Sequence, residues 1–290
     1  DHNERNPLDT DMVVVDEASR FYQQCESLNE PLLLRARDAA LRAGVSTHFA
    51  LLQDVLDDIA PPSPAYLFLN AFHLTPAQRE RLHARLEREA SCAIWLYAPG
   101  YIDESGAAEH VAATTCMQVA AFEEPTASGS AFALAGRWLH QDEPFGEKRV
   151  CYPLFYIEDE QADVLARYRN TERASVAMRY LPEGWSSVYI AEPTVSPKLL
   201  REILRILERS LYFRTTGHDL IDTTHIGHNL LAVHASESGQ RAVYLGRPCD
   251  IEDLFDPTVG WPQKESFPMP MNTGDTRLLR LTPLIPPESP

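Results

Sequence analysis

The apolar run at residues 91–97 constrains the fold of this chain more than any other segment. Its sequence is Ser-Cys-Ala-Ile-Trp-Leu-Tyr, and it ends abruptly at Ala98-Pro99-Gly100. A strand that is apolar at both odd and even positions is typical of the centre of a parallel sheet, where helices cover both faces. In open sheets of this kind, the loop after such a strand faces the crevice where ligands bind. The run therefore predicts an α/β fold with a candidate site just after Tyr97.

Short apolar runs earlier in the chain predict further strands of the same sheet. They lie at residues 12–15, 45–50 and 66–70, and a segment with helical features follows each of them. A β-α-β-α-β-α-β order implies a parallel sheet joined by right-handed crossovers. We therefore expect the N-terminal part of the chain to be a three-layer α/β domain.

Two of the expected helices have recognisable ends. Thr75 is placed to cap one helix, with Pro76 at its first position and Gln78 completing a capping box. An earlier helix is expected to begin after Asn29, which would cap it, and to end at Gly44, where a left-handed backbone is favourable.

The pattern changes in the second half of the chain. Residues 116–158 contain several short extended runs, which predict antiparallel strands, and a helix with one apolar stripe begins at Pro197. Strands dominate after that helix. We predict a linker at residues 1–11, an α/β domain at 12–211, a mostly antiparallel β-rich elaboration at 212–282 and a proline-rich tail at 283–290.

Composition excludes several classes of partner. The formal net charge is −16, and this disfavours nucleic acid and anionic membranes, which both select clustered Lys and Arg. No apolar segment approaches the roughly 18 residues that a membrane span needs. The five cysteines show no regular spacing, so they assign no compartment. Because the chain begins at Asp1 without a Met, we expect it to be part of a longer product, cytoplasmic or exported with its parent.

Eight segments, in order along nearly the whole chain, carry a family resemblance. They lie at residues 12–17, 66–75, 95–101, 184–189, 199–203, 230–235, 250–255 and 274–281. Together they resemble the glutamine-amidotransferase-like domain attached to bacterial β-galactosidases and related glycoside hydrolases, which is often called the trimerisation domain.

The resemblance implies a fold and a role. The fold would be a three-layer parallel sheet of the flavodoxin or class I glutamine amidotransferase type. The role would be that of a non-catalytic assembly or accessory domain, with the hydrolytic carboxylates in a separate barrel domain of the parent protein. Its partners would be that catalytic barrel or further copies of the same domain.

The turn after Tyr97 supports a non-catalytic role on chemical grounds. An enzyme with a nucleophile elbow would place Ser or Cys in this turn between glycines, whereas the chain has Ala98-Pro99-Gly100. We therefore predict no catalytic residue. One enzymatic alternative stays open, a diverged hydrolase with Cys116 as nucleophile and His110 nearby.

A binding module is the other alternative. Asp16, Asn70, Tyr97, Gly100 and Tyr101 all follow predicted parallel strands, whose carboxyl ends meet at one edge of a sheet. The same five residues are therefore our candidates for lining a shallow crevice that takes a carbohydrate or another small ligand. Equally, Tyr101 could simply pack against the next helix.

The sequence points to no metal and no cofactor. His218, Asp219, Asp222, His225 and His228 are close enough in sequence to suggest a divalent metal, but they form no compact ligand motif. We interpret them as solvated loop residues. No glycine-rich phosphate loop follows any predicted strand, which disfavours a nucleotide cofactor.

One further segment is a candidate contact surface. Residues 261–271 carry Trp261, Phe267, Met269 and Met271 between prolines, and they match neither a helix nor a strand pattern. Aromatic anchors with little charge are typical of interface centres. We expect this segment to contact a second copy or the catalytic barrel, unless it straps across the core of its own domain.

Overall fold

The structure, a computed structural model, describes residues 11–22, 28–133, 135, 140–207, 213–214, 222–227 and 229–284. Contacts divide the chain into two compact units. The first, here called the α/β unit, consists of residues 11–39 and 48–202. The second, here called the C-terminal unit, contains residues 40–47 and 203–290. Each unit is described by itself.

One half of the α/β unit is the predicted parallel sheet. Its strand order is β2 (Thr47–Leu51), β1 (Asp11–Val15), β3 (Ala65–Phe68), β4 (Cys92–Leu96) and β13 (Ser186–Ile190). The pairs β1–β3, β3–β4 and β4–β13 are parallel. Every residue of β3 and β4 is buried, as the unbroken apolar run at residues 91–97 predicted. The α/β class is therefore confirmed.

The other half of the sheet is antiparallel, so the sheet is mixed rather than parallel throughout. It continues from β13 through β12 (Ala174–Tyr180), β11 (Asp163–Tyr168), β7 (Ser130–Phe132) and β8 (Pro144–Phe145). Two shorter strands branch off: β10 (Phe155–Ile157) pairs with β12, and β5 (Val119–Ala121) pairs with β10. Strands β6 (Thr126–Ala127) and β9 (Val150–Cys151) form a separate two-stranded sheet.

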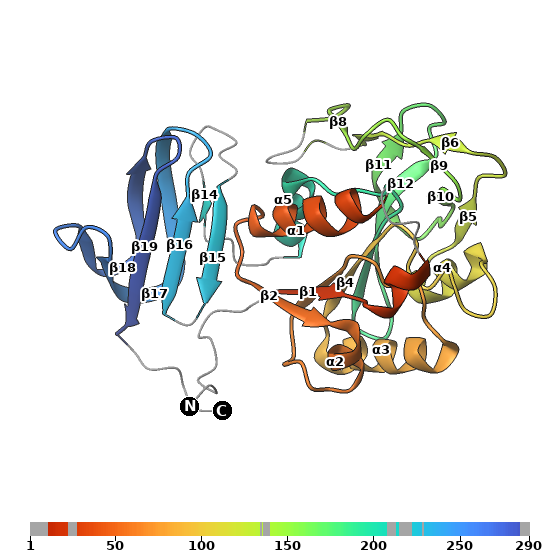
Figure 1. The fold of residues 1–290 in the computed structure, drawn as a ribbon, viewed down its shortest axis with the longest axis horizontal. Coiled ribbons are helices and arrows are strands. Elements are labelled where there is room, and N and C mark those ends of the chain that lie inside the picture. Colours follow the sequence, from red (N-terminus) through yellow and green to blue (C-terminus); the bar gives the residue numbers. More distant parts are fainter. Residues whose placement is uncertain are drawn as a thin grey trace. The chain divides into compact units, whose positions relative to one another are not determined.

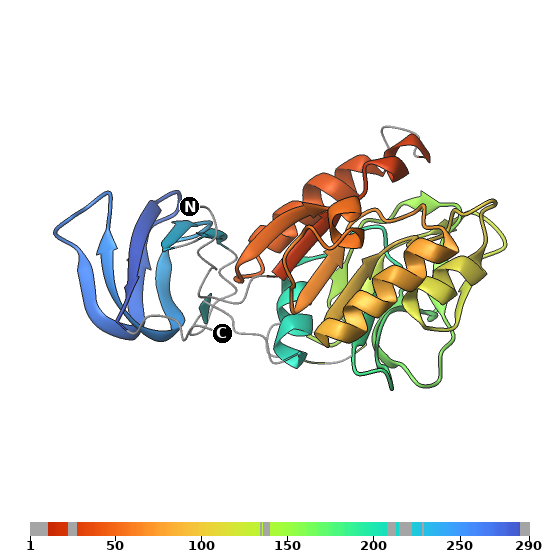
Figure 2. The same cartoon turned by 90° about the horizontal axis from the view of Figure 1, so that it is seen from below.

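Helices cover both faces of the parallel half (Figure 1). The helices are α1 (Ala36–Leu41), α2 (Leu52–Leu56), α3 (Pro76–Glu89), α4 (Ala108–Thr115) and α5 (Pro197–Ile206). Helices α1 and α5 lie on one side and α2 and α3 on the other, while Figure 2 shows α4 beside α3. None of the helices in the described part of the chain is long and apolar enough to cross a membrane.

The helix ends match the sequence in one case and differ in another. Both hydrogen bonds of the capping box between Thr75 and Gln78 are present, which confirms that prediction. Asn29 was expected to cap the earlier helix, and this is wrong: its φ and ψ of −62° and −42° are already helical, and its side chain makes no cap bond. The helix instead begins with a wider turn, η2 (Glu30–Arg35), which runs on into α1.

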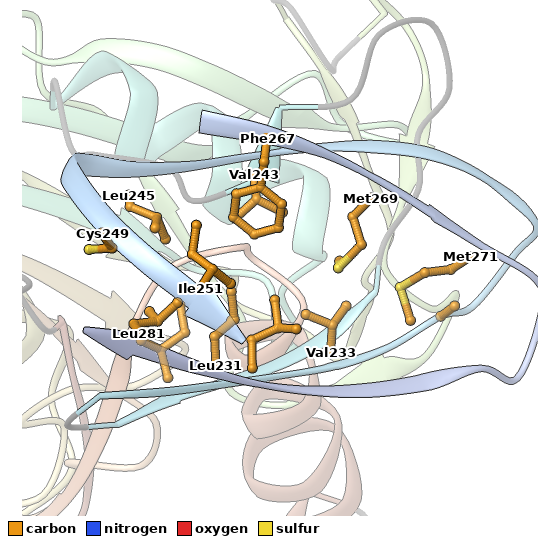
Figure 3. Close-up of a cluster of buried hydrophobic side chains, with 13 residues drawn as sticks. Leu231, Val233, Val243, Leu245, Cys249, Ile251, Phe267, Met269, Met271 and Leu281 are labelled. Carbon is orange, nitrogen blue, oxygen red and sulfur yellow. The ribbon is translucent and has the colours of Figure 1, made fainter. Parts of the chain in front are cut away.

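The C-terminal unit is an antiparallel sheet, as predicted for this part of the chain. Its strand order is β14 (Phe213–Arg214), β17 (Gly239–Asp253), β19 (Thr276–Pro283), β16 (Leu230–His234) and β15 (Thr223–Gly227), and β18 (Gly260–Met271) pairs with β17. The sheet curves around its own apolar core, to which β15, β16, β17, β18 and β19 all contribute (Figure 3).

Strand β18 corrects the expectation that residues 261–271 lie outside any strand. Phe267, Met269 and Met271 are 3%, 0% and 4% exposed and point into the core of the C-terminal unit (Figure 3). Trp261 packs against the same core. Within the described residues β18 pairs with β17 alone, and the strand tolerates its prolines because a proline in an edge strand can direct its nitrogen away from the neighbour. The segment is thus part of its own core, which leaves these side chains unavailable as interface anchors.

Candidate functional site at the carboxyl ends of the parallel strands

Asp16 and Asn70 lie side by side, as their positions after parallel strands predict. The backbone N–H of Asp16 donates to Asn70 Oδ1 at 2.8 Å, and Asn70 Nδ2 donates back to the Asp16 carbonyl at 2.8 Å. The register between β1 and β3, with Val14 opposite Phe68, brings the two residues to the same edge. Asn70 is fully buried, so its amide holds two strand ends together instead of facing solvent.

The carboxylate of Asp16 is also used within the chain. It accepts hydrogen bonds from the backbone N–H and the hydroxyl of Ser19, in the short helix η1 (Ala18–Tyr22). The same Ser19 oxygen accepts from the consecutive backbone N–H groups of Phe72 and His73, both at 2.9 Å. Two adjacent N–H groups of this kind commonly bind an anion or a ligand oxygen. Here the chain's own hydroxyl occupies them.

Tyr97 occupies the turn where a nucleophile elbow would place its reactive residue. Its φ of +65° is left-handed, a conformation that costs energy for a residue with a bulky side chain. Hydrogen bonds hold it there: its N–H donates to Ile190 at 2.8 Å, and its carbonyl accepts from the Tyr189 hydroxyl at 2.6 Å. Its own hydroxyl donates to the Pro153 carbonyl at 2.6 Å, and burial raises the pKa of this phenol. The strain of an elbow is therefore present, but the group presented is a neutral, buried phenol.

Gly100 and Tyr101 complete the set. Gly100 has a φ of +67°, and an added Cβ would lie 2.1 Å from Thr114 Oγ1, so this position requires glycine. Its N–H donates to the Ala71 carbonyl at 2.7 Å, next to Asn70. The Tyr101 ring packs edge-on against Phe155, with ring centres 5.3 Å apart.

The structure thus places the candidate residues at one edge of the sheet, where most of their side chains are buried. Asp16, Asn70 and Tyr97 are at most 8% exposed, and their polar groups bond to one another or to nearby backbone. Tyr101 is the only member of the set whose side chain is partly exposed. The sequence had assigned these positions to the right edge without indicating that the chain would fill the space itself.

Glu192 is a chemically notable residue that the sequence analysis missed. It follows β13, so it lies at the same edge as Tyr97, and it is fully buried. A polar residue directly after a predicted strand is the signal that selected Asp16 and Asn70, and the same signal is present at residue 192.

Cys116 lies at the opposite edge of the sheet, and the described histidine nearest to it is not placed to accept its proton. The Ser187 hydroxyl, at the start of β13, donates to the carbonyl of Thr115. His83 Nε2 is 3.9 Å from Cys116 Sγ, but it is also 2.9 Å from the Thr114 carbonyl oxygen. Because a carbonyl oxygen can only accept a hydrogen bond, Nε2 must be the donor in that contact. The proton of a neutral His83 therefore sits on Nε2, and burial raises the pKa of the thiol. His110 instead lies near the Tyr101 carbonyl, at 3.3 Å.

The histidine-rich segment offers no assembled metal site in the part that can be described. His218, Asp219 and His228 lie outside the described residues. Both carboxylate oxygens of Asp222 accept hydrogen bonds from Arg241, at 2.8 and 2.9 Å. Within the described ranges, no group of three potential ligands is close enough to hold a metal ion.

The fold and the site define a mixed α/β domain whose candidate site lies at the carboxyl ends of its parallel strands. No family model and no curated protein matches the chain. Solved structures do share its fold. A β-galactosidase from Bacillus circulans sp. alkalophilus superposes with a TM-score of 0.61 and 13% identity, over 95% of this chain and 42% of that one.

A second solved structure gives the same result. The β-galactosidase of the Antarctic haloarchaeon Halorubrum lacusprofundi superposes with a TM-score of 0.59 and 12% identity, over 94% of this chain and 40% of that one. The chain therefore spans about two fifths of each β-galactosidase and shares the fold of that part.

Proposed function

We propose that this chain is a non-catalytic assembly or accessory domain of a longer, glycoside-hydrolase-like protein. The observation that carries the proposal is the elbow at Tyr97. A left-handed residue at the end of a central strand is the position where α/β hydrolases present a nucleophile. A phenol that is buried and bonded to the Pro153 carbonyl cannot serve in that role.

The fold comparison supports the same proposal. Both β-galactosidases are more than twice as long as the part that this chain matches. On this proposal, the chain is the amidotransferase-like domain of trimerisation type, and the catalytic groups lie in a barrel that it does not contain. Its partners are then that barrel or further copies of itself.

The test is an activity assay of the isolated chain, with nitrophenyl galactosides and glutamine as substrates. We expect no turnover of either. Cys116→Ala is the informative variant, because it removes the alternative nucleophile at a site distant from the elbow. Turnover by the unmodified chain that disappears in this variant would overturn the proposal in favour of a Cys-dependent hydrolase.

Ligand binding is the second candidate function, and the exposed aromatic surface near Tyr101 favours it. Tyr22 is 53% exposed and stacks on His73, with ring centres 5.1 Å apart. His73 in turn bridges to Ile102, the residue after Tyr101. Aromatic rings of this kind can pack against the apolar face of a sugar. Calorimetry with galactose and lactose tests this candidate, and unchanged heats in Tyr101→Ala would argue against it.

A further inference from the structure

Glu192 is a carboxyl group enclosed by two strands that are distant from it in sequence. Its oxygens accept hydrogen bonds from the Gly129 N–H, at 3.1 Å to each, and from the Ser130 hydroxyl at 2.8 Å. Gly146 covers it from the other side, with a φ of +79°, and an added Cβ there would lie 2.6 Å from Glu192 Oε1. The side chain is therefore held between β7, which begins at Ser130, and β8, which ends just before Gly146.

The described groups that face this carboxyl are neutral. Besides the donors above, they are the Ser128 hydroxyl, the Cys151 thiol of β9 and the Tyr168 phenol of β11. Burial also raises the pKa values of that thiol and that phenol, so both keep their protons near neutral pH.

Two basic side chains on the surrounding described segments pair with other carboxylates. Arg149 pairs with Glu147 at 3.3 Å, and Lys198 pairs with Glu143 at 3.0 Å. A buried carboxylate without a cation is unfavourable, and such a group normally takes up a proton. Burial accordingly raises the pKa of Glu192 to about 7, against the lowering effect of its hydrogen bonds to Gly129, Ser130 and Ser128.

We propose that Glu192 is a pH-operated latch, which holds β7 and β8 closed over the end of β13 when protonated and releases them when ionised. Ionisation sends a proton to solvent and leaves a charge that water stabilises better than this enclosure does. The strands β7 and β8 are the elements able to respond, because they are the last two at their end of the sheet and contain three and two residues. Short edge elements open at a lower free energy than the central strands.

Hydrogen exchange of the full chain, corrected for the intrinsic pH dependence of exchange, tests the latch. The pKa of Glu192 is about 7 when β7 and β8 are closed over it, and we take the ordinary value of 4.5 when they are open. The protection of the β7 and β8 amides should then fall about tenfold from pH 6 to pH 8.5. The Glu192→Gln variant should lose this dependence, because its amide stays neutral. The matched control is Glu158→Gln, at an exposed carboxylate paired with Arg173, and it should keep the dependence.

A second measurement covers the case in which Glu192→Gln fails to fold. The carboxyl carbon of Glu192 can be followed by NMR during a pH titration of the unmodified chain. A midpoint near pH 7 that coincides with the loss of protection supports the latch. A midpoint below pH 5, or protection of β7 and β8 that is constant from pH 6 to pH 8.5, would overturn it. Both outcomes are independent of whether the chain is an accessory domain.

Discussion

Arg241 is a buried charged residue that joins several segments of the C-terminal unit. It is fully buried, and its guanidinium donates to both oxygens of Asp222 and to the carbonyls of Gly239, Glu237 and Met271. These bonds tie the segment before β15 to the end of the β17–β18 pairing where Gly239 lies opposite Met271. Removing one member of such a pair leaves the other charge buried and unpaired.

We predict that Arg241→Met lowers the free energy of unfolding of the C-terminal unit by about 3–5 kcal/mol. Hydrogen exchange of the β17 and β18 amides in increasing urea measures the change. Arg280→Met is the matched control: Arg280 is 55% exposed and pairs with Glu252 at 3.0 Å, so its loss should cost at most about 1 kcal/mol. Similar effects of the two substitutions would contradict this account.

At the scale of elements, α3 tests a prediction made from sequence. Thr75 accepts the Gln78 N–H, and Gln78 accepts the Thr75 N–H at 2.9 Å. Thr75→Ala should therefore destabilise the α/β unit by about 1 kcal/mol, because the Gln78 N–H loses its acceptor while the N–H of residue 75 keeps its bond to the Gln78 side chain. Thermal unfolding by circular dichroism is the measurement. Glu87→Ala, at an exposed position of the same helix, should leave the midpoint nearly unchanged.

Strand β18 gives a second test at this scale. Because Phe267 is 3% exposed and packs against Trp261, with tilted rings whose centres are 4.5 Å apart, Phe267→Ala should cost about 3–5 kcal/mol of stability. Its neighbour Glu265 is exposed, so Glu265→Ala should have little effect. Light scattering distinguishes a core role from an interface role. A variant that keeps its stability but changes its molar mass would show that Phe267 is an interface anchor after all.

The sequence predicted those helices and strands that depend on a few consecutive residues. The run at residues 91–97 became β4, and the Thr75 capping box formed as expected. Residues 261–271 were misjudged because proline argues against a strand, whereas this strand, among the described residues, pairs only with β17 and can accept it. Which strand β18 pairs with is set by the tertiary structure and cannot be seen in a short window of sequence.

The sequence predicted where the candidate residues lie in the sheet, but it did not predict that most of them are buried. Parallel register was enough to bring Asp16 and Asn70 together. Whether the space between the strand ends is open depends on Ser19 and Pro153, whose contacts span more than 50 residues of sequence. The position of Glu192 after a predicted strand was visible in the sequence, but its enclosure by Ser130 was not, because that contact joins positions 62 residues apart.

For the whole molecule, the two units should respond to pH in opposite directions. The folded-state pKa of Glu192 is raised to about 7, so its contribution to stability is complete below pH 4.5 and is lost as the pH rises through 7. Burial alone would raise the pKa of Asp222, but the bonds from Arg241 outweigh it and hold that pKa below 3.8. The contribution of Asp222 is therefore present above pH 4 and lost in acid.

We predict two calorimetric transitions whose separation changes with pH. The α/β unit should lose about 3 kcal/mol between acid and pH 8.5, the linkage equivalent of the Glu192 shift. The C-terminal unit should instead weaken below pH 4. In the Glu192→Gln variant the α/β unit should no longer lose stability as the pH rises, whereas the C-terminal unit should still lose stability below pH 4. A single transition that moves as a whole with pH would contradict the independence of the two units.

The prolines of β18 also bear on how the protein behaves in concentrated solution. An edge strand with free N–H groups is a template on which other chains can aggregate. At positions 262, 268 and 270 of β18 there is no N–H to offer, and Lys264 adds a charge to the same edge. We therefore expect the prolines and Lys264 of this strand to oppose edge-to-edge aggregation of the C-terminal unit.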